Sequence, residues 1–541
     1  MEFREEQEAF PSATREREEF SDSLLATPTS IEGYINTMRA YLLAILIVAM
    51  SCPSSYGASE NDWFVPLGKP PEAPPKRISG GEAFPPLPYP ATPLRRTERK
   101  RQPTPPSLFG KVVWGEQGSF TYDGGKTTQI SDWNLCPADL QHLFNKVQNK
   151  LGLQYGFDDV SLPSFSGDPD KMAVLFFSGT RTLKLDPQSL AQLRAYVLRG
   201  GMLCFDSVAG SPYFHDSARA LMQQAFPELA WRVVPPDHPL YHMVNDVNTV
   251  HYSANVDSDK PQLEALYIGS RIGVLLSKYG LGCGWDDHAV PLIKDAAYYD
   301  PGSADSIGLN LVAYVIGYNR VGMEESKPEL FAAVDEKTPT DEFVFAQIEH
   351  DGAFNVHPNS ATALLSKLRV ATSLRVNLKR VVVDPGKDDL SNLSFLYLTG
   401  LDDFHLSDNA VSALRGFLQR NGTLFINNGL GLSTFDRAVR RELARVLPGA
   451  KLEPIPLSHS IFSDVVSVQN ADYTPAVAMR YGKLNTPMLE GITLGGDVRV
   501  IYSPIDLEAG WEPTEYPMAI AYRQDTAIPL GMNILMYAAT H

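Results

Sequence analysis

The sequence predicts two tandem three-layer α/β/α domains with mainly parallel sheets. The first observation is an internal repeat, because a shift of 221 residues matches 134–241 to 355–462 without a gap. A period of that length exceeds the roughly 20–50 residues of solenoid repeats, so whole domains are duplicated. The second observation is that short apolar runs alternate with amphipathic stretches in each copy, which is typical of a parallel sheet covered on both faces.

The second copy shows this alternation most clearly. Helices are predicted at 361–369 and at 407–420, where Ser407 is the N-cap and Asn421-Gly422 ends the helix. Strands are predicted from the apolar runs 343–348, 381–383, 395–399 and 423–426. Since ligands of such sheets bind beyond the carboxyl ends of the strands, a site is expected there.

The N-terminal region predicts an exported chain, periplasmic or secreted. Met38-Arg39 and the apolar run 40–50 have the layout of a signal peptide over 38–57, cleaved after Gly57. Residues 1–37 are then a start-site artefact or a disordered extension. The apolar run is too short for a bilayer span, which needs about 20 residues, so no transmembrane span is predicted in the mature chain. Lipidation of Cys52, which would make the chain a lipoprotein, is left open.

Proline content predicts a linker, and the net charge bears on nucleic-acid binding. Thirteen prolines between Pro66 and Pro106 predict a linker over 58–107. A second linker, 323–341, separates a first domain at 108–322 from a second at 342–541. The net charge of −16 disfavours nucleic-acid binding, which needs a positive surface.

The cysteines do not indicate a disulfide scaffold. After removal of the signal peptide only Cys136, Cys204 and Cys283 remain, an odd number. None of them forms the Cys-x-x-Cys spacing of a zinc site. Cys204 falls within an apolar strand pattern, where a buried thiol is expected.

A series of short motifs runs along residues 342–541. It includes Phe345-Ala-Gln-Ile-Glu-His-Asp-Gly352, Leu396-Tyr-Leu-Thr-Gly400, Ser503-Pro-Ile-Asp-Leu507 and Gly510-Trp-Glu512. In this order the motifs resemble an uncharacterised bacterial domain family, domain of unknown function 4159. They also resemble the class I glutamine amidotransferase-like fold, which implies a flavodoxin-like architecture for each copy. The first copy keeps a weaker, degenerate version, with Gly284-Trp285-Asp286 and Gly308-Leu-Asn310.

The resemblance does not bring amidotransferase activity with it. That chemistry needs a cysteine on the sharp turn after a strand, with a histidine and a glutamate to activate it. The corresponding turns read Asp206-Ser207-Val208 and Asn427-Asn428-Gly429, without cysteine. Cys204 lies two residues earlier, inside the strand.

Polar residues gather where the carboxyl ends of the second sheet are expected. The catalytic candidates are Asp403, His405, His459 and Glu512. The ligand-binding candidates are His350, Asp351, Asp402, Asn427, Asn428, Asp506 and Trp511. Such carboxylates and histidines can bind a divalent metal or divide acid and base roles. The alternative is that strand-end loops are polar in any protein.

Two of these candidates also have structural interpretations. His459 coincides with His238 in the repeat, which favours a histidine that holds its loop through a backbone hydrogen bond. Trp511 coincides in motif with Trp285, and each either stacks on a sugar ring or lies in the core.

Three functions compete. The favoured one is a non-catalytic binding or scaffolding module of the cell envelope, whose partner is an envelope protein or a glycan. The second is a metal-assisted hydrolase acting on a carbohydrate or amide through the second domain. The third is a structural envelope protein tethered through its proline-rich segment. No cofactor is predicted, a divalent metal is left open, and the sequence does not indicate an oligomeric state.

Overall fold

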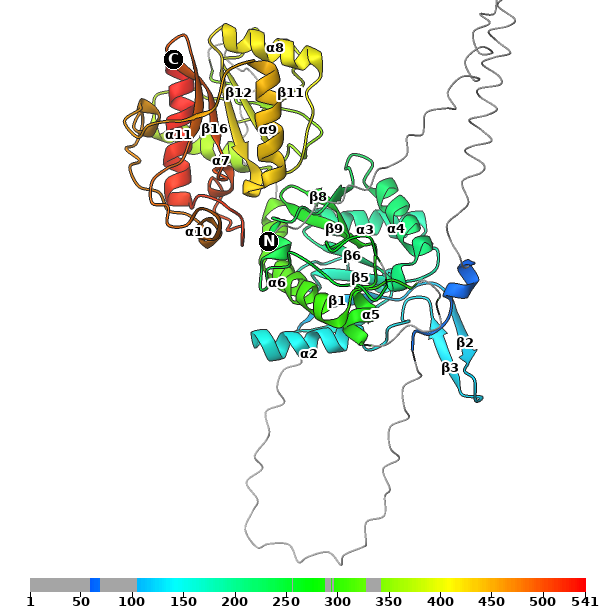
Figure 1. Cartoon of the computed structure of the whole chain (residues 1–541). Coiled ribbons are helices and arrows are strands. Elements are labelled where there is room, and N and C mark those ends of the chain that lie inside the picture. The colour runs from blue at the N-terminus through cyan, green and yellow to red at the C-terminus, as the bar shows by residue number, and fades with distance from the viewer. Residues whose placement is uncertain (1–58, 69–104, 255, 288–292, 294–295, 327–341) are drawn as a thin grey trace, which may run out of the picture. The chain divides into compact units, whose positions relative to one another are not determined.

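The computed structural model describes residues 59–68, 105–254, 256–287, 293, 296–326 and 342–541 (Figure 1). The segments 1–37 and 38–57, Cys52 and most of both predicted linkers lie outside the described residues. In the part of the chain that the structure describes, no helix has both the length and the apolar character needed to cross a membrane.

The first domain is built on a seven-stranded sheet in the order β4-β1-β5-β6-β9-β8-β7. The strands from β4 to β9 pair in parallel, and β8 and β7 add two antiparallel strands at one edge. The strands are β1 (Ser107–Val112), β4 (Gly156–Val160), β5 (Val174–Gly179), β6 (Met202–Ser207), β7 (Arg232–Val233), β8 (Leu263–Ile268) and β9 (Arg271–Ser277). The helices are α2 (Asp139–Leu151), α3 (Pro187–Leu198), α4 (Pro212–Ala225), α5 (Leu281–Asp286) and α6 (Pro301–Glu325). A separate hairpin is formed by β2 (Gln117–Thr121) and β3 (Thr127–Ser131).

The second domain repeats this topology in the order β11-β10-β12-β13-β16-β15-β14. Again the strands from β11 to β16 are parallel, and β15 and β14 are antiparallel. The strands are β10 (Ala346–Ile348), β11 (Val381–Val383), β12 (Phe395–Gly400), β13 (Thr423–Asn428), β14 (Glu453–Pro454), β15 (Glu490–Leu494) and β16 (Asp497–Ser503). The helices are α7 (Ser360–Ala371), α8 (Asp408–Gln419), α9 (Ser433–Val446), α10 (Pro475–Tyr481) and α11 (Gln524–Thr540).

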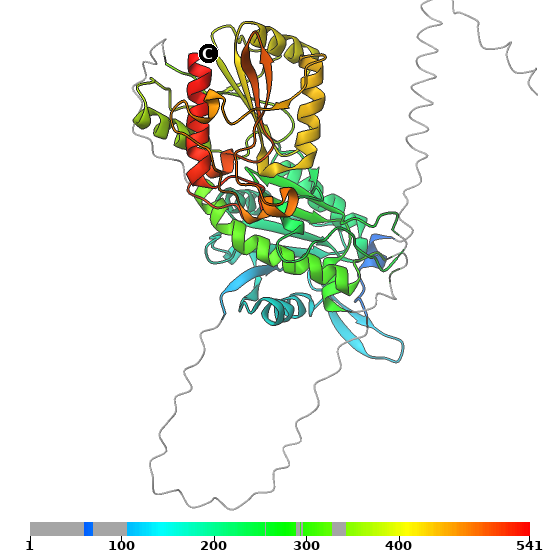
Figure 2. The same ribbon diagram turned by 60° about the vertical axis from the view of Figure 1, so that its left-hand side comes forward.

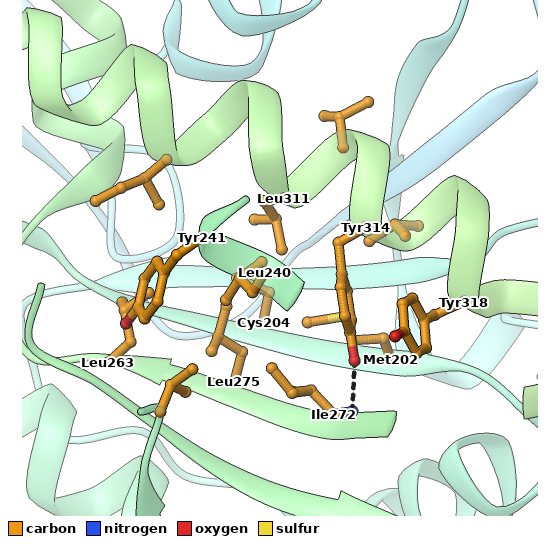
Figure 3. Close-up of a cluster of buried hydrophobic side chains, with 14 of the residues drawn as sticks. Met202, Cys204, Leu240, Tyr241, Leu263, Ile272, Leu275, Leu311, Tyr314 and Tyr318 are labelled. Carbon is orange, nitrogen blue, oxygen red and sulfur yellow. Dashed lines mark hydrogen bonds between the residues drawn. The ribbon is translucent and has the colours of Figure 1, made fainter. Parts of the chain in front are cut away.

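Successive side chains of a strand point to opposite faces of the sheet, and helices cover both faces. In the first domain Phe176 and Cys204 pack toward α2 and α6, whereas Phe177 and Phe205 pack toward α3 and α4. Figure 3 shows the layer beneath α6, where the hydroxyl of Tyr314 accepts a hydrogen bond from the backbone of Ile272 at 3.0 Å. The prediction of three-layer α/β domains with mainly parallel sheets is therefore confirmed.

The second domain has the same three layers. Tyr397 and Phe425 pack toward α7 and α11, whereas Leu398 and Ile426 pack toward α8 and α9. Figures 1 and 2 show α11, in red, on one side of this sheet and α9, in yellow to orange, on the other.

The helix predicted at 407–420 shows how local sequence sets an element's ends. The side chain of Ser407 accepts a hydrogen bond from the backbone N–H of Ala410 at 3.2 Å, which caps α8. The chain leaves the helix at Asn421, whose φ of 69° is left-handed. Asparagine tolerates this conformation better than most residues with a side chain.

Residues 59–68 lie within the predicted linker, and they pack against the first domain. They contain a short helical turn, η1 (Glu60–Trp63), and Trp63 is buried. The hydroxyl of Thr180 donates to the carbonyl of Trp63 at 2.5 Å, and a carboxylate oxygen of Glu60 accepts from the backbone of Thr182 at 2.8 Å. Both threonines follow β5, so this segment covers the carboxyl edge of the first sheet.

Candidate functional site

The carboxyl edge of the second sheet holds a cluster of buried polar side chains. The parallel strands β12, β13 and β16 end side by side here, and Asn427 of β13 pairs in register with Ser503 of β16. Three residues after Ser503, the chain places Asp506 beside Asn427. In α/β sheets this edge is where ligands bind.

Asp506 is the centre of the cluster, and its side chain is fully buried. One carboxylate oxygen accepts from the Asn427 amide at 2.9 Å and from the backbone N–H of Ala509 at 3.1 Å. The other accepts from Nε2 of His357 at 3.0 Å and from the backbone N–H of Leu430 at 2.7 Å. Four donors therefore converge on one carboxylate, the arrangement that favours its charged form.

His357 and Asp506 form a buried ion pair. Burial alone would raise the pKa of Asp506, but the neighbouring His357 and the hydrogen bonds outweigh it, and the pKa is lowered. Burial alone would lower the pKa of His357, but the carboxylates of Asp506, Glu508 and Glu512 raise it to about 9. At neutral pH the pair is therefore an imidazolium and a carboxylate.

The second ring nitrogen of His357, Nδ1, does not take part in the contact with Asp506. Nδ1 is buried, and within the described residues it has no hydrogen-bond partner. The imidazole packs edge-on to the ring of Tyr516, with ring centroids 4.4 Å apart. A protonated Nδ1–H in this position can donate to a ligand, but it is a poor general base because it already carries its proton.

Glu508 extends the buried network on the side of α7. One of its carboxylate oxygens accepts from the Ser360 hydroxyl at 2.6 Å and the other from the Tyr397 hydroxyl at 2.8 Å. Burial raises the pKa of Glu508. Ser360 is thus held by Glu508 and by the carbonyl of His357.

The sequence predicted Asn427 and Asp506 in this cluster but missed His357, Ser360, Tyr397 and Glu508. A signal was present for His357, because the repeat aligns His357-Pro358 with Cys136-Pro137. Three histidines were predicted as site residues, His350, His405 and His459, and none of them joins the cluster.

His350 holds a loop. Its Nε2 lies 2.8 Å from the carbonyl of Thr399, and its Nδ1 accepts from the backbone N–H of Gly352 at 3.0 Å. Burial lowers the pKa of His350 to about 4, so the ring is neutral at pH 7. Both ring nitrogens are engaged with backbone, which leaves none for a substrate.

Asp403 and His405 lie on the outside of the domain, next to α9. Asp403 is 60% exposed and pairs with Arg441 at 2.8 Å. His405 is 66% exposed, and its Nδ1 lies 3.2 Å from the buried carboxylate of Glu442. The neighbouring carboxylates serve the same loop, since Asp351 accepts from the backbone of His405 and Asp402 from that of Asp403. The loop is held by these contacts and by the arginine of α9.

His459 lies at the opposite edge of the sheet. Its ring packs against Tyr537, whose hydroxyl accepts from the backbone of Val498 near the start of β16. Nδ1 of His459 accepts from the backbone N–H of Ile461 at 3.3 Å, as Nδ1 of His238 does from Leu240 at 3.1 Å. The two equivalent histidines make the same loop contact.

The remaining candidates lie in the core or line one of two cavities. Trp511 is buried and donates from Nε1 to the carbonyl of Ala527 at 3.2 Å. Glu512 is buried and lines a cavity of about 350 Å³ together with Tyr516 and Arg523. Asn428 donates to the carbonyl of Pro504 at 3.3 Å and lines a smaller cavity of about 180 Å³. The four catalytic candidates therefore do not converge on one point.

The turn after β13 has the geometry of a nucleophile turn without the nucleophile. Leu430 adopts φ 53°, and the equivalent Ala209 after β6 adopts φ 55°. Each is the second residue after a central strand. Hydrolases of α/β fold present their nucleophile from a strained strand-to-helix turn of this kind. Here both side chains are apolar and buried.

The first domain fills the same edge with different groups. Lys111 of β1 is buried and pairs with Asp139 at 2.8 Å. By the repeat, Asp139 stands at the position of Ser360, and Cys136 at that of His357. The carboxylate of Asp206 accepts from the backbone of Leu281 and Gly282 at 2.6 and 2.9 Å. The two edges thus share a backbone but not their chemistry.

Among the residues that the structure describes, no group of three or more His, Cys, Asp or Glu side chains is placed to hold a metal ion.

Fold and site together define a tandem pair of three-layer α/β domains with a filled carboxyl edge in each copy. The family model for the domain of unknown function DUF4159 matches residues 125–316 and again residues 344–539. The chain therefore belongs to the DUF4159 family and carries its domain twice. No curated protein matches the chain in a sequence search.

Proposed function

We propose that the protein is an exported, non-catalytic binding or scaffolding module of the cell envelope. One observation carries the proposal: the strained position after each central strand is occupied by Ala209 or Leu430, so neither copy presents a nucleophile from that position. The separation of Asp403, His405, His459 and Glu512 supports it further, because acid and base groups must act within hydrogen-bond reach of one substrate. Export rests on the predicted signal peptide alone.

The ligand site we assign is the cavity of about 350 Å³ in the second domain. Its volume is in the range of small-ligand sites, roughly 300–1,000 Å³. The lining combines charged side chains with aromatic rings, namely Glu512, Glu515, Tyr516, Tyr522, Arg523 and Asp525. Carboxylates and guanidinium groups hydrogen-bond hydroxyls, and aromatic rings pack against apolar ring faces, so a glycan unit fits this lining better than an apolar ligand.

Co-sedimentation with purified cell-wall glycan tests the assignment. Thr514 lines the cavity and is half-buried, so Thr514→Trp should fill the cavity and reduce the bound fraction at least tenfold. Thr493 is an exposed residue of β15, so Thr493→Trp is the matched control and should bind as the unchanged protein does. Equal binding by both variants would refute the cavity assignment.

The hydrolase alternative is tested on the same protein. Metal-dependent turnover of a glycan or amide that is abolished by Glu512→Gln would overturn the non-catalytic proposal. Retained glycan binding with no turnover supports it.

A further inference from the structure

Two cysteines meet at the carboxyl edge of the first sheet. Cys136 lies just before α2 and Cys283 lies within α5, and their Sγ atoms are 3.8 Å apart. Each is only 1% exposed. The backbone N–H of Ala209, at the strained turn, donates to Sγ of Cys283 at 3.3 Å. Three segments that are distant in sequence therefore converge on this pair.

We propose that Cys136 and Cys283 form a disulfide bond when the protein meets a thiol-oxidising environment. An S–S bond is about 2.05 Å long, so the sulfur atoms need to approach by about 1.8 Å. Side-chain rotation at two cysteines can provide much of that movement. The odd cysteine count argued against a disulfide scaffold, but it does not exclude one bond and one free thiol.

Cys204 is the free thiol in this assignment. It lies in the middle of β6 and packs in the layer beneath α6, where Figure 3 shows it among Leu240, Leu275 and Met202. The pair belongs to a different cluster, with Trp63, Leu67 and Ala209 among its members. Cys204 is therefore an internal control of the same burial in the same domain.

The pair is shielded in the folded protein. Trp63 and Leu67 of the docked segment pack in the same apolar cluster, which keeps oxidants away from the sulfur atoms. The hydrogen bond with Cys283, and then burial, raise the pKa of the Cys136 thiol well above its usual value. Because the thiolate is the reactive form, exchange in the folded state should be slow, and the bond should form as the domain folds.

The oxidant in this step is a small-molecule disulfide. The thiolate of one cysteine attacks a sulfur of oxidised glutathione, forming a mixed disulfide and releasing one reduced glutathione. The second cysteine then displaces the other glutathione, so two thiol protons and two electrons pass to the oxidant. In the cell this step rests on the proposed export, because disulfides persist mainly in oxidising compartments.

The test is refolding of the full chain carrying Cys52→Ser in a glutathione redox buffer, followed by alkylation in denaturant and peptide mass spectrometry. We expect a linked pair of peptides containing Cys136 and Cys283, with Cys204 alkylated. Cys136→Ser should abolish the link and Cys204→Ser should retain it. The oxidised protein should unfold at a temperature several degrees above that of the reduced protein, typically about 4 °C or more for a domain of this size.

The outcomes are separable. Full alkylation of all three cysteines after oxidative refolding would overturn the pairing, as would a link that involves Cys204. A link that forms on refolding but is absent in protein isolated from cells supports the pairing and contradicts the proposed export.

Discussion

His357 and Asp506 form an ion pair at 3.0 Å in which neither side chain is exposed, although 149 residues separate them. The pair joins the segment before α7 to the segment after β16 and fixes the turn at Leu430, whose N–H shares the same carboxylate. In the first domain the equivalent N–H of Ala209 is bound by the sulfur of Cys283. One backbone site is thus stabilised by a carboxylate in one copy and by a thiol in the other.

Replacement of Asp506 by asparagine should strongly destabilise the second domain. It leaves a buried imidazolium without its counter-charge and turns an amide N–H₂ toward backbone donors. Breaking a buried pair in this way costs about 3–5 kcal/mol. Urea unfolding of the full chain, followed by tryptophan fluorescence, measures the loss of free energy.

Asp403→Asn is the matched control, because Asp403 is also a carboxylate paired with a cation but is 60% exposed. Exposed pairs contribute at most about 1 kcal/mol. Similar losses in the two variants would show that the buried pair is no more important than a surface one.

The ion pair should also make stability depend on pH on the alkaline side. The pKa of His357 is raised from 6.5 to about 9, so the folded state holds this proton more tightly than the unfolded state. The stabilisation is fully present below pH 6.5 and is lost as the pH rises toward 9, by an amount on the order of 3 kcal/mol.

The measurement is the free energy of unfolding of the unchanged protein and of His357→Gln between pH 6 and 9.5. Glutamine can keep a hydrogen bond to Asp506 but does not titrate, so the difference between the two proteins should shrink as the pH rises. A constant difference across this range would contradict a charged His357. Burial lowers the pKa of His459, at the opposite edge, so His459→Gln should leave the slope unchanged above about pH 8.

Much of the fold was accessible from the sequence because its signals are local or periodic. Ser407 marks the start of α8 through its own side chain, and the spacing of the repeat aligns Pro137 with Pro358 across whole domains. Such signals need no knowledge of which distant segments meet.

The buried cluster was accessible only in part, because it is made by contacts between distant segments. Asn427 lies at the end of β13 and Asp506 follows β16, and both were predicted as site residues. His357 comes from a loop, and only its contact with Asp506 makes it part of the cluster. Asp403 and His405 also follow a strand, but Arg441 and Glu442 of α9 engage them at the surface. The sequence does not show on which side of the sheet the loop after a strand will lie.

The strained turn predicts an unusual response to glycine at Ala209. Its φ of 55° is costly for alanine but not for glycine, so Ala209→Gly relieves strain of about 1 kcal/mol. The added freedom of the unfolded chain offsets this by about 0.4–1 kcal/mol. We expect the free energy of unfolding to stay within about 0.5 kcal/mol of the unchanged protein.

Ala218→Gly is the comparison, since Ala218 is equally buried but lies in the interior of α4. There glycine should cost about 1 kcal/mol or more. Equal losses at the two positions would mean that the packing of the Ala209 methyl group, rather than backbone strain, determines its stability.

The docking of segment 59–68 on the first domain should depend on Trp63. The indole is 6% exposed and belongs to the cluster around Cys136 and Cys283, whereas neighbouring Phe64 is half-buried under the guanidinium of Arg181. Trp→Ala in a core costs roughly 3–5 kcal/mol, but loss of one cation–π contact costs only about 0.5–1 kcal/mol. Trp63→Ala should therefore release the segment, whereas Phe64→Ala should leave it docked.

Limited proteolysis within 59–68 and the rate of thiol labelling at Cys136 both report the release. Protection that is unchanged in Trp63→Ala would show that the other contacts of the segment, among them the hydrogen bonds to Thr180 and Thr182, are sufficient to hold it.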